Sequence, residues 1–326
     1  MTGITTHGEK RLVLATGRAH PELADAVAEE LGIDLLPTTV YDFANGEIYA
    51  RFNESVRGSD AFVLQSFAEG INHWIMETLI MIDALKRASA KRVTVVAPSY
   101  PYSRQDKKHR GREPVSARLM SDLFKTAGAD RLMSVDLHAS QIQGFFDGPV
   151  DHLFAMPILT DYVRTRVDLD KLTIVSPDAG RIRVAEQWAE KMGGARLAFV
   201  HKTRDITRPN QAVANRVVGD VEDRIAVLVD DMIDTAGTIS EAVRVVLASG
   251  ATEVIVAATH GILSDPAARR LAECGAREVV VTDTLPIARE KQFPGLTVLS
   301  IAPLLARAIR EVFDDGSVTS LFDGVS

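Results

Sequence analysis

Two adjacent carboxylates, Asp230 and Asp231, follow a short apolar run, and a turn rich in threonine and glycine comes directly after them. The apolar run at 225–229 is typical of a buried strand, and the stretch at 239–248 is typical of a helix. At the start of a helix, unpaired backbone N–H groups and the helix dipole favour an anion. The turn at 235–238 is therefore expected to bind a phosphate.

The two carboxylates would repel a bound phosphate, so we expect a different role for them. Carboxylate oxygens accept hydrogen bonds from vicinal hydroxyls, such as those of a ribose ring. Hydroxyl acceptors and anion-binding amides on one strand-to-helix turn together predict a sugar-phosphate site. The alternative is a plain strand end at which Asp234 or Thr235 caps an ordinary helix. An isolated acidic pair would favour that alternative, whereas the whole stretch is more specific.

One pattern recurs four times and predicts the elements that carry such residues. A small residue, an alanine and two polar or charged residues lead into an apolar run, starting at Ser89, Gly128, Gly250 and Gly275. A glycine just past a helix provides a left-handed cap, and the run behind it is typical of a strand buried on both faces. Alternating helices and buried strands predict an α/β fold with mainly parallel sheets flanked by helices.

The two halves of the chain resemble diverged copies of one α/β unit. Each half holds two of the four patterns, and His138 follows Gly128 at the same interval of 10 residues that separates His260 from Gly250. Glycines and prolines interrupt the pattern between the halves without forming a long linker. We therefore expect two domains, 1–155 and 156–326.

Composition excludes several classes of protein. The 326 residues, 46% of them hydrophobic, are enough for a sizeable core in each half. A net charge of −7 gives no global attraction to nucleic acid or to an anionic membrane. The single cysteine, Cys274, fits a reducing compartment, and we find neither a secretory signal nor an apolar run of membrane-spanning length. We expect a cytoplasmic protein with no nucleic-acid or membrane partner.

Four segments together carry a family resemblance. The stretch 225–238 is similar to the loop that phosphoribosyltransferases share with phosphoribosyl diphosphate synthases. With the segments 98–108, 135–146 and 175–180, it closely resembles class I ribose-phosphate pyrophosphokinases. The resemblance runs from about residue 12 to residue 322, which is nearly the whole chain.

The resemblance implies a reaction and an assembly. The 1-hydroxyl of ribose 5-phosphate attacks the β-phosphorus of ATP, giving AMP and phosphoribosyl diphosphate for nucleotide, histidine and tryptophan biosynthesis, and Mg²⁺ is required. It also implies two phosphoribosyltransferase-like domains, an N-terminal one on the nucleotide side and a C-terminal one with the ribose 5-phosphate site and the catalytic loop. The family assembles into homo-oligomers, usually hexamers.

On the nucleotide side, the resemblance implies an adenine subsite that a neighbouring subunit completes. An aromatic face with amide and carboxylate acceptors suits a purine that carries an exocyclic amine. Asn45 stands where many members have Asp, and its carbonyl can still accept from that amine. The alternative for Phe43 is a core aromatic beside a turn. The matching residues are Phe43, Asn45, Glu47, Arg104 and Gln105.

On the ribose side, the resemblance implies that Asp230 and Asp231 hold the hydroxyls and that the turn holds the 5-phosphate. The turn residues are Asp234, Thr235, Ala236, Gly237 and Thr238. His138 and Asp178 match the Mg²⁺ positions, although a lone histidine after a strand is more often structural. Arg181 stands where many members have a second glycine, which leaves the details of that loop open.

The segment 200–211 resembles the flexible catalytic loop of the family. Lys202 and Arg204 match its two basic positions, with Arg204 also reaching ribose 5-phosphate. A compact ammonium and a planar guanidinium both suit a phosphoryl group that gathers charge. The alternative is a solvated basic loop.

A third group matches, piece by piece, positions that bind inorganic phosphate as activator and ADP as inhibitor. These residues are Ser55, Arg57, Gln143, Ser317 and Thr319. Two other functions remain open: a phosphoribosyltransferase that shares only the loop at 230–238, and a non-catalytic regulatory partner of the synthase.

Overall fold

The computed structural model describes residues 10–203 and 214–322. The chain divides into two compact units, which are described separately here. The first comprises Met1–Leu153 together with Ala302–Ser326, and the second comprises Phe154–Ile301. Within the described ranges, no helix is long and apolar enough to cross a bilayer.

The first unit is built on a sheet of five strands that all run parallel. In spatial order the strands are β1 (Leu12–Thr16), β4 (Asp60–Leu64), β5 (Arg92–Ala97), β6 (Arg131–Val135) and β7 (Val150–Leu153). A separate antiparallel hairpin, β2 (Thr38–Asp42) and β3 (Ile48–Phe52), lies between β1 and β4 in sequence.

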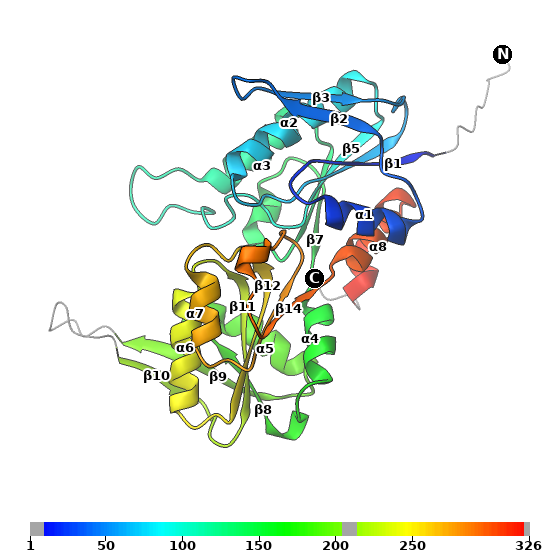
Figure 1. The fold of residues 1–326 in the computed structure, drawn as a ribbon. Coiled ribbons are helices and arrows are strands. Elements are labelled where there is room, and N and C mark those ends of the chain that lie inside the picture. The colour runs from blue at the N-terminus through cyan, green and yellow to red at the C-terminus, as the bar shows by residue number, and fades with distance from the viewer. Residues whose placement is uncertain (1–9, 204–213, 323–326) are drawn as a thin grey trace, which may run out of the picture. The chain divides into compact units, whose positions relative to one another are not determined.

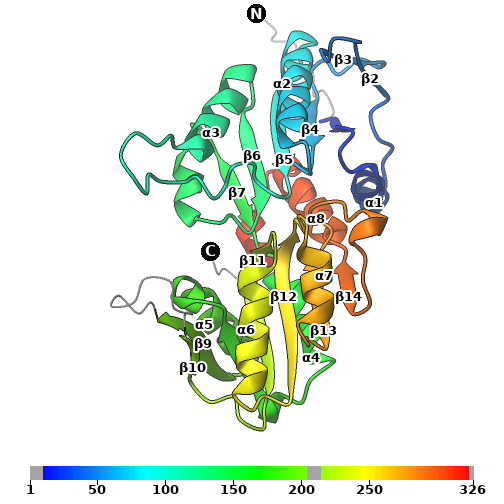
Figure 2. The same cartoon turned by 60° about the vertical axis from the view of Figure 1, so that its left-hand side comes forward.

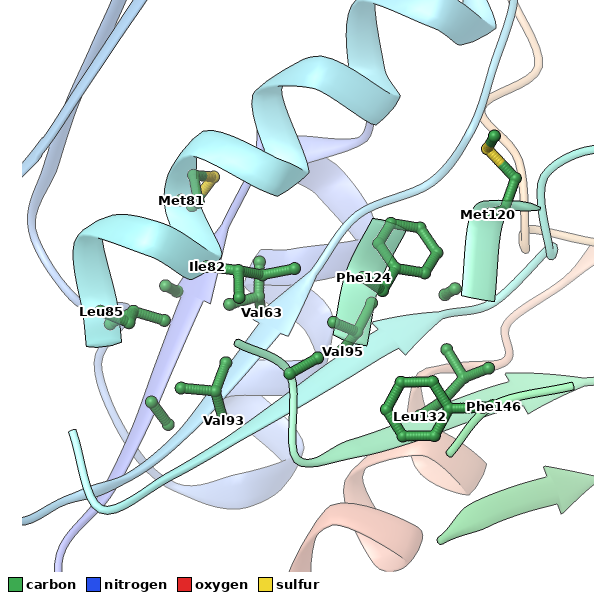
Figure 3. Packing of buried hydrophobic residues seen from close by; sticks show 14 of the residues in the cluster. Val63, Met81, Ile82, Leu85, Val93, Val95, Met120, Phe124, Leu132 and Phe146 are labelled. Atoms are coloured by element: carbon green, nitrogen blue, oxygen red, sulfur yellow. The ribbon is translucent and has the colours of Figure 1, made fainter. Parts of the chain in front are cut away.

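Helices α2 (Ile71–Arg87) and α3 (Ser116–Ala127) cover one face of this sheet and form the core shown in Figure 3. Their buried side chains pack on strand residues of β4, β5 and β6, and burying such apolar surface is the main stabilising contribution to the unit. The labelled residues are Val63, Met81, Ile82, Leu85, Val93, Val95, Met120, Phe124, Leu132 and Phe146. A short 3₁₀ turn, Ser140–Gly144, precedes β7.

The C-terminal helix α8 (Ala302–Phe313) packs beside α1 (Pro21–Leu31) in the first unit (Figure 1). Arg310 donates from Nη2 to the carbonyl oxygen of Leu31 at 2.6 Å, and Lys10 donates to that of Phe313 at 2.7 Å. The expected domain 156–326 therefore differs from the structure, in which residues 302–326 belong with the first unit. The buried face of α8 needs an apolar partner, and α1 provides it.

The second unit is built on a sheet of seven strands, mostly parallel. The antiparallel pair is β10 with β9. In spatial order the strands are β10 (Ala214–Val218), β9 (Arg196–Thr203), β8 (Leu172–Ser176), β11 (Ile225–Ile233), β12 (Glu253–Gly261), β13 (Glu278–Thr282) and β14 (Leu296–Leu299).

Helices lie on both faces of this second sheet, as Figures 1 and 2 show. Alternate strand residues such as Leu228 and Val256 pack with α6, while their neighbours Val227 and Ile255 are equally buried. Burial on both faces explains the unbroken apolar runs. The helices are α4 (Met156–Arg164), α5 (Ile182–Lys191), α6 (Gly237–Ala248) and α7 (Ala267–Glu273), with 3₁₀ turns at Leu169–Lys171, Ala179–Arg181 and Arg289–Lys291, and one at Val318–Phe322 in the first unit.

All four predicted helix-to-strand joints are present. Ser89, Gly128, Gly250 and Gly275 have positive φ angles of 67°, 116°, 94° and 92°, and strands β5, β6, β12 and β13 begin three residues after them. Ser89 adopts the same left-handed conformation as the three glycines, which shows that the position requires it. The predicted α/β class with mainly parallel sheets and flanking helices is confirmed.

Candidate active site

Strand β11 carries the acidic pair and is longer than the predicted 225–229. It continues to Ile233, pairing with β12 as far as Gly261. Its pairing with β8 stops at Leu228. Asp230 and Asp231 therefore extend past the end of β8, at the carboxyl edge of the sheet, where parallel α/β proteins place their ligands.

Arg181 reaches this pair from the loop that follows β8. Its Nη2 lies 2.7 Å from Oδ1 of Asp231, and its Nε lies 3.5 Å from Oδ1 of Asp230. The backbone N–H of Asp231 also donates to Oδ1 of Asp230 at 2.9 Å. The side chains of Arg181, Asp230 and Asp231 are only 19%, 16% and 9% exposed. One guanidinium thus bridges two largely buried carboxylates.

The electrostatics of the pair depend on this bridge. Burial raises the pKa of Asp230 well above its usual range, and the neighbouring charge of Asp231 raises it further. The Arg181 guanidinium acts in the opposite direction and lowers the pKa of Asp230. Arg181 therefore favours the ionised pair, in which the carboxylate oxygens accept hydrogen bonds.

The predicted anion-binding turn leads directly into α6. Ala236 has φ 58°, a left-handed conformation that is uncommon outside glycine, and its carbonyl oxygen accepts from the N–H of Ser240 at 2.9 Å. The first backbone N–H groups of a helix have no partner within the helix. The sharp turn thus places the start of α6 at Gly237, six residues after Asp231 in sequence, with Thr235 and Thr238 on either side.

Arg270, on α7, adds a positive charge beside the same turn. Its Nη1 donates to the carbonyl oxygen of Thr235 at 2.9 Å, and a Cβ built on Gly237 would lie 3.5 Å from that nitrogen. The sequence analysis did not single out Arg270. No local motif marks it, because its approach depends on how α7 packs beside α6.

Phe43 lies at the tip of the β2–β3 hairpin in the first unit. Its N–H donates to the carbonyl oxygen of Glu47 at 2.7 Å, and the turn between them contains Gly46 with φ 87°. The Phe43 residue is 46% exposed, so the alternative interpretation of it as a core aromatic is wrong. Oδ1 of Asn45 accepts from the N–H of Glu47 at 3.2 Å, which stabilises the turn.

Two tyrosines support Phe43 on the hairpin. The Tyr41 ring meets the Phe43 ring edge-on with centroids 5.3 Å apart, and it stacks on the Tyr49 ring at 4.8 Å. Tyr41 is itself 43% exposed. The hairpin therefore presents an exposed aromatic cluster of the kind that binds planar rings.

The base of the hairpin is held by an ion-pair network that reaches the buried side chain of Glu77. Arg18 donates from Nη2 to Asp42 at 2.6 Å and from Nε to Glu77 at 2.7 Å. Glu77 lies on α2 with a fully buried side chain and also accepts from Gln65 at 3.1 Å. This network ties the strand that leads to Phe43 to the helix layer.

Arg104 and Gln105 are exposed on the loop between β5 and α3. The carbonyl oxygen of Gln105 accepts from the N–H of Ala117 at 3.1 Å, and Oε1 of Gln105 accepts from Ser116 at 2.5 Å. This part of the loop is thus fastened to the start of α3. Both predicted nucleotide residues belong to the same unit as Phe43.

His138 follows β6 on a segment held by β7. Asp136 has φ 39°, and its N–H donates to the carbonyl oxygen of Leu153 at 2.9 Å. The N–H of Leu137 donates to Nε2 of His152 at 2.9 Å, so the ring acts as an acceptor. His152, which the sequence analysis missed, thus positions the backbone immediately before His138. By contrast, His260 is buried within β12 beside Thr284.

Asp178 lies on a tight turn after β8. Its Oδ1 accepts from the N–H of Gly180 at 2.8 Å, and its carbonyl oxygen accepts from Ser176 at 2.6 Å. Mg²⁺ is usually held by one or two carboxylates together with substrate phosphates, so this oxygen donor fits the ion. His138 belongs to the first unit and Asp178 to the second. Among residues 10–203 and 214–322, no three potential metal ligands cluster.

The two basic residues of the predicted catalytic loop are described only in part. Lys202 lies on strand β9, with its backbone opposite Asn215 of β10. The predicted loop thus begins on a strand that extends to Thr203. Arg204 lies outside the described residues.

The five residues predicted to bind phosphate or ADP all belong to the first unit. The carbonyl oxygen of Ser55 accepts from Arg11 at 2.7 Å, and Ser317 and Thr319 share a hydrogen bond of 2.7 Å. Ser55, Arg57 and Gln143 are exposed, as are Ser317 and Thr319. Ser317 and Thr319 fall in the first unit only because the C-terminal segment returns to it.

Two α/β units with mainly parallel sheets, one of which carries an acidic pair and a helix start on a single turn, are the architecture expected of a sugar-phosphate-binding protein of the α/β class. Two family models match the chain: the N-terminal domain of ribose phosphate pyrophosphokinase over residues 12–128, and the phosphoribosyl synthetase-associated domain over residues 173–323.

Curated relatives cover almost the whole chain. A ribose-phosphate pyrophosphokinase of Bifidobacterium longum is 70% identical over 317 residues, 97% of this chain and 93% of that protein. One of Mycobacterium bovis is 64% identical over 319 residues, 98% of each chain. The crystal structure of phosphoribosylpyrophosphate synthetase from Mycobacterium smegmatis matches with a TM-score of 0.89 and 63% identity, covering 94% of this chain and 100% of that one.

The chain therefore belongs to the ribose-phosphate pyrophosphokinase family, and it is an enzyme. The family resemblance stated from the sequence is confirmed. The two other functions left open by the sequence, a phosphoribosyltransferase and a non-catalytic partner, are set aside.

Proposed function

We propose that this enzyme transfers the β,γ-diphosphoryl group of ATP to the 1-hydroxyl of ribose 5-phosphate. The hydroxyl oxygen forms a bond to the β-phosphorus, the bond from that phosphorus to the α,β-bridging oxygen breaks, and AMP leaves while the hydroxyl proton is released. The observation that carries the proposal is the turn from β11 to α6, which combines the acidic pair with an anion-binding helix start.

Ribose 5-phosphate binding is assigned to the second unit. Asp230 and Asp231 accept hydrogen bonds from the vicinal hydroxyls, since ionised carboxylates are strong acceptors. Residues 234–238 hold the 5-phosphate through backbone N–H groups and hydroxyls. Arg270 supports this assignment with a cation beside Thr235.

ATP binding is assigned to the first unit. The exposed ring of Phe43 offers a face for adenine, and Asn45 and Glu47 offer acceptors at the same hairpin tip. One of the two lone pairs of the Asn45 carbonyl is used by the turn, and the other is available to an exocyclic amine. Phe43, Asn45 and Glu47 complete the adenine subsite of a neighbouring subunit, and that receiving subunit supplies its own Arg104 and Gln105. The active enzyme is therefore a homo-oligomer, a hexamer in this proposal.

Mg²⁺ is the proposed cofactor, held by His138 and Asp178. When bound with ATP, the ion neutralises charge on the phosphate oxygens. The turn around Asp178 fixes one carboxylate oxygen through Gly180, and His152 fixes the backbone before His138. The chain itself thus fixes the Asp178 carboxylate and the backbone that leads to His138.

Lys202 and Arg204 are proposed to stabilise the charge that develops on the phosphoryl group in the transition state of its transfer. Phosphoryl transfer requires little covalent chemistry from the protein, so positioning and electrostatics supply most of the rate. Ser55, Arg57, Gln143, Ser317 and Thr319 remain the proposed site for phosphate as activator and ADP as inhibitor. The single cysteine and the motifs of a metabolic enzyme favour a cytoplasmic location.

Steady-state kinetics on two site variants test the sugar-phosphate assignment. Asp231→Asn removes a charged acceptor, and Gly237→Val places a branched side chain at the helix start beside Arg270. Both should raise the KM for ribose 5-phosphate with much less effect on the KM for ATP. Asp223→Asn is a matched control, because Asp223 is exposed before β11 in a left-handed conformation that Asn tolerates. Unchanged ribose 5-phosphate kinetics in both site variants would contradict the assignment.

A further inference from the structure

The Arg181 guanidinium joins the two carboxylates through one rigid planar group. It lies 2.7 Å from Oδ1 of Asp231 through Nη2 and 3.5 Å from Oδ1 of Asp230 through Nε. A guanidinium presents its N–H groups in a fixed fork, so binding both carboxylates at once fixes their orientation relative to each other. An ammonium, which is a point charge on a flexible stem, would fix them less well.

The backbone delivers Arg181 to this position. Asp230 and Asp231 extend past the last pairing of β11 with β8, on the side from which the loop after β8 approaches. In that loop, the Asp178 side chain fixes the N–H of Gly180, and Arg181 ends the 3₁₀ turn immediately before α5. The side chain of Arg181 is 19% exposed. The loop geometry and the burial of Arg181 thus fix this contact, which differs from that of a surface arginine free to adopt other conformations.

Two neighbouring carboxylates in a largely buried place resist ionising together. One of them retains a proton unless a positive charge stands close by. A retained proton would turn a carboxylate oxygen from an acceptor into a donor, and a sugar hydroxyl would lose one of its acceptors. Arg181 supplies a charge that opposes this retention, and its fork fixes the direction in which the oxygens of both groups point.

We propose that Arg181 is a positioning residue for ribose 5-phosphate, which stays between Asp230 and Asp231 when the sugar binds and holds both carboxylates toward the vicinal hydroxyls. This inference rests on the proposed function. In the alternative, Arg181 competes with the sugar for the two carboxylates and must be displaced when the sugar binds. The two cases predict opposite changes in the KM for ribose 5-phosphate. Loss of a positioning residue raises this KM, whereas loss of a competitor lowers it.

The test is the split between the two KM values in Arg181→Gln. A hydrogen bond to a charged group that is lost in this way corresponds to a rise of about 10- to 100-fold in the KM for ribose 5-phosphate. The KM for ATP should change by less than about threefold, because Arg181 acts through the carboxylates proposed to bind the sugar. Arg181→Lys keeps the charge without the fork and should give an intermediate KM for ribose 5-phosphate.

Arg244→Gln is the matched control. It removes the same charge from α6, where the Arg244 side chain is 52% exposed and contacts only Glu241 at 3.8 Å among the ion pairs that the structure describes. Both KM values should stay near those of the wild type. A rise in the KM for ribose 5-phosphate equal to that of Arg181→Gln would show a nonspecific charge effect and would overturn the inference.

A double variant tests the mechanism. With Asp230→Asn already present, only one carboxylate remains to be neutralised, so adding Arg181→Gln should raise the KM for ribose 5-phosphate less than it does in the wild type. Equal increases in both backgrounds would overturn the inference. If Arg181→Gln alone does not fold, Arg181→Lys provides the test. A KM for ribose 5-phosphate in Arg181→Lys identical to that of the wild type would then contradict the positioning role of Arg181.

The inference and the proposed function fail in different ways. Release of AMP that depends on ribose 5-phosphate in the wild type, and the effect of Asp231→Asn, test the function without reference to Arg181. If both results are as expected while Arg181→Gln leaves the KM for ribose 5-phosphate unchanged or lowers it, the positioning role of Arg181 is wrong and the proposed function is unaffected.

Discussion

The guanidinium of Arg18 donates from Nε to the carboxylate of Glu77 at 2.7 Å, and the Glu77 side chain is fully buried. The backbone N–H of Arg18 donates to the same carboxylate at 2.7 Å. A buried charge is tolerated when it is paired and hydrogen-bonded in this way, and removing one partner leaves the other uncompensated. Because Arg18 also binds Asp42, the pair connects the core of the first unit to the hairpin that carries Phe43.

Replacing Glu77 with alanine should therefore destabilise the protein by about 3 kcal/mol or more. The physical reason is the loss of the hydrogen bonds that the buried Glu77 carboxylate accepts from Arg18 and Gln65, together with a cavity. Denaturant unfolding of the variant measures this free energy. Asp83→Ala on the same helix is the control, since Asp83 makes an exposed pair with Arg87, whose loss should change stability little. Equal losses in the two variants would contradict the role given to Glu77.

Asp230→Asn should stabilise the protein increasingly as the pH rises, while it weakens use of ribose 5-phosphate. The pKa of Asp230 is raised in the folded state, mainly by burial. The unfolded chain therefore loses this proton first, and stability falls as the pH rises from the unfolded pKa to the folded pKa. Asn cannot ionise and escapes that loss, so its advantage is absent at low pH and complete above the folded pKa.

Thermal unfolding of both proteins between about pH 5 and pH 8.5 measures this difference. A relative gain of the order of 1 kcal/mol across the window corresponds to one unit of pKa. Asp223→Asn, an exposed change just before the same strand, is the control for loss of a carboxyl group. A stability difference for Asp230→Asn that does not vary with pH would show that the carboxyl of Asp230 is not perturbed.

Mixing two inactive variants should restore activity. Phe43→Ala removes the proposed adenine contact, and Lys202→Ala removes the proposed catalytic cation. If a neighbouring subunit completes each nucleotide site, mixed oligomers contain some sites that are damaged at neither position. Subunits exchanged at moderate denaturant should then recover a fraction of wild-type activity. An unmixed variant treated in the same way is the control, and a fully active monomer in sedimentation would contradict the shared site.

Single alanine substitutions of Lys202 and Arg204 should each lower kcat by roughly 10²–10³-fold, as expected when one preorganised donor is removed. Because these groups act mainly in the transition state, the KM values should change much less. Steady-state kinetics measures both constants. If the residues belong only to a solvated loop, kcat stays within a few-fold of the wild type and stability changes by less than about 0.5 kcal/mol.

Features set by short stretches of sequence could be predicted well. The four joints follow from a residue in the left-handed conformation and an apolar run, both of which are local. The turn from β11 to α6 was predicted in the same way, although β11 extends four residues beyond the expected Val229 because β12 continues beside it. The sequence of β11 alone does not reveal how far the neighbouring strand β12 extends.

Features set by distant contacts could not be predicted. Arg181 was noted only as a departure from the family pattern, because its partners lie some 50 residues away. The return of α8 to the first unit depends on the surface of α1, which no pattern in 302–326 reveals. His152 and Arg270 likewise act through single contacts made by packing, and their side chains have no local motif.

The central claim is attack by ribose 5-phosphate on the β-phosphorus of ATP, and isotope labelling tests it most directly. ATP with ¹⁸O in the α,β-bridging position is incubated with the enzyme and Mg²⁺, with and without ribose 5-phosphate, and the nucleotide products are separated and weighed by mass spectrometry. We predict AMP that retains the bridging ¹⁸O and forms only when ribose 5-phosphate is present, in equal amount to phosphoribosyl diphosphate. Formation of ADP, or of AMP at the same rate without the sugar phosphate, would contradict the account.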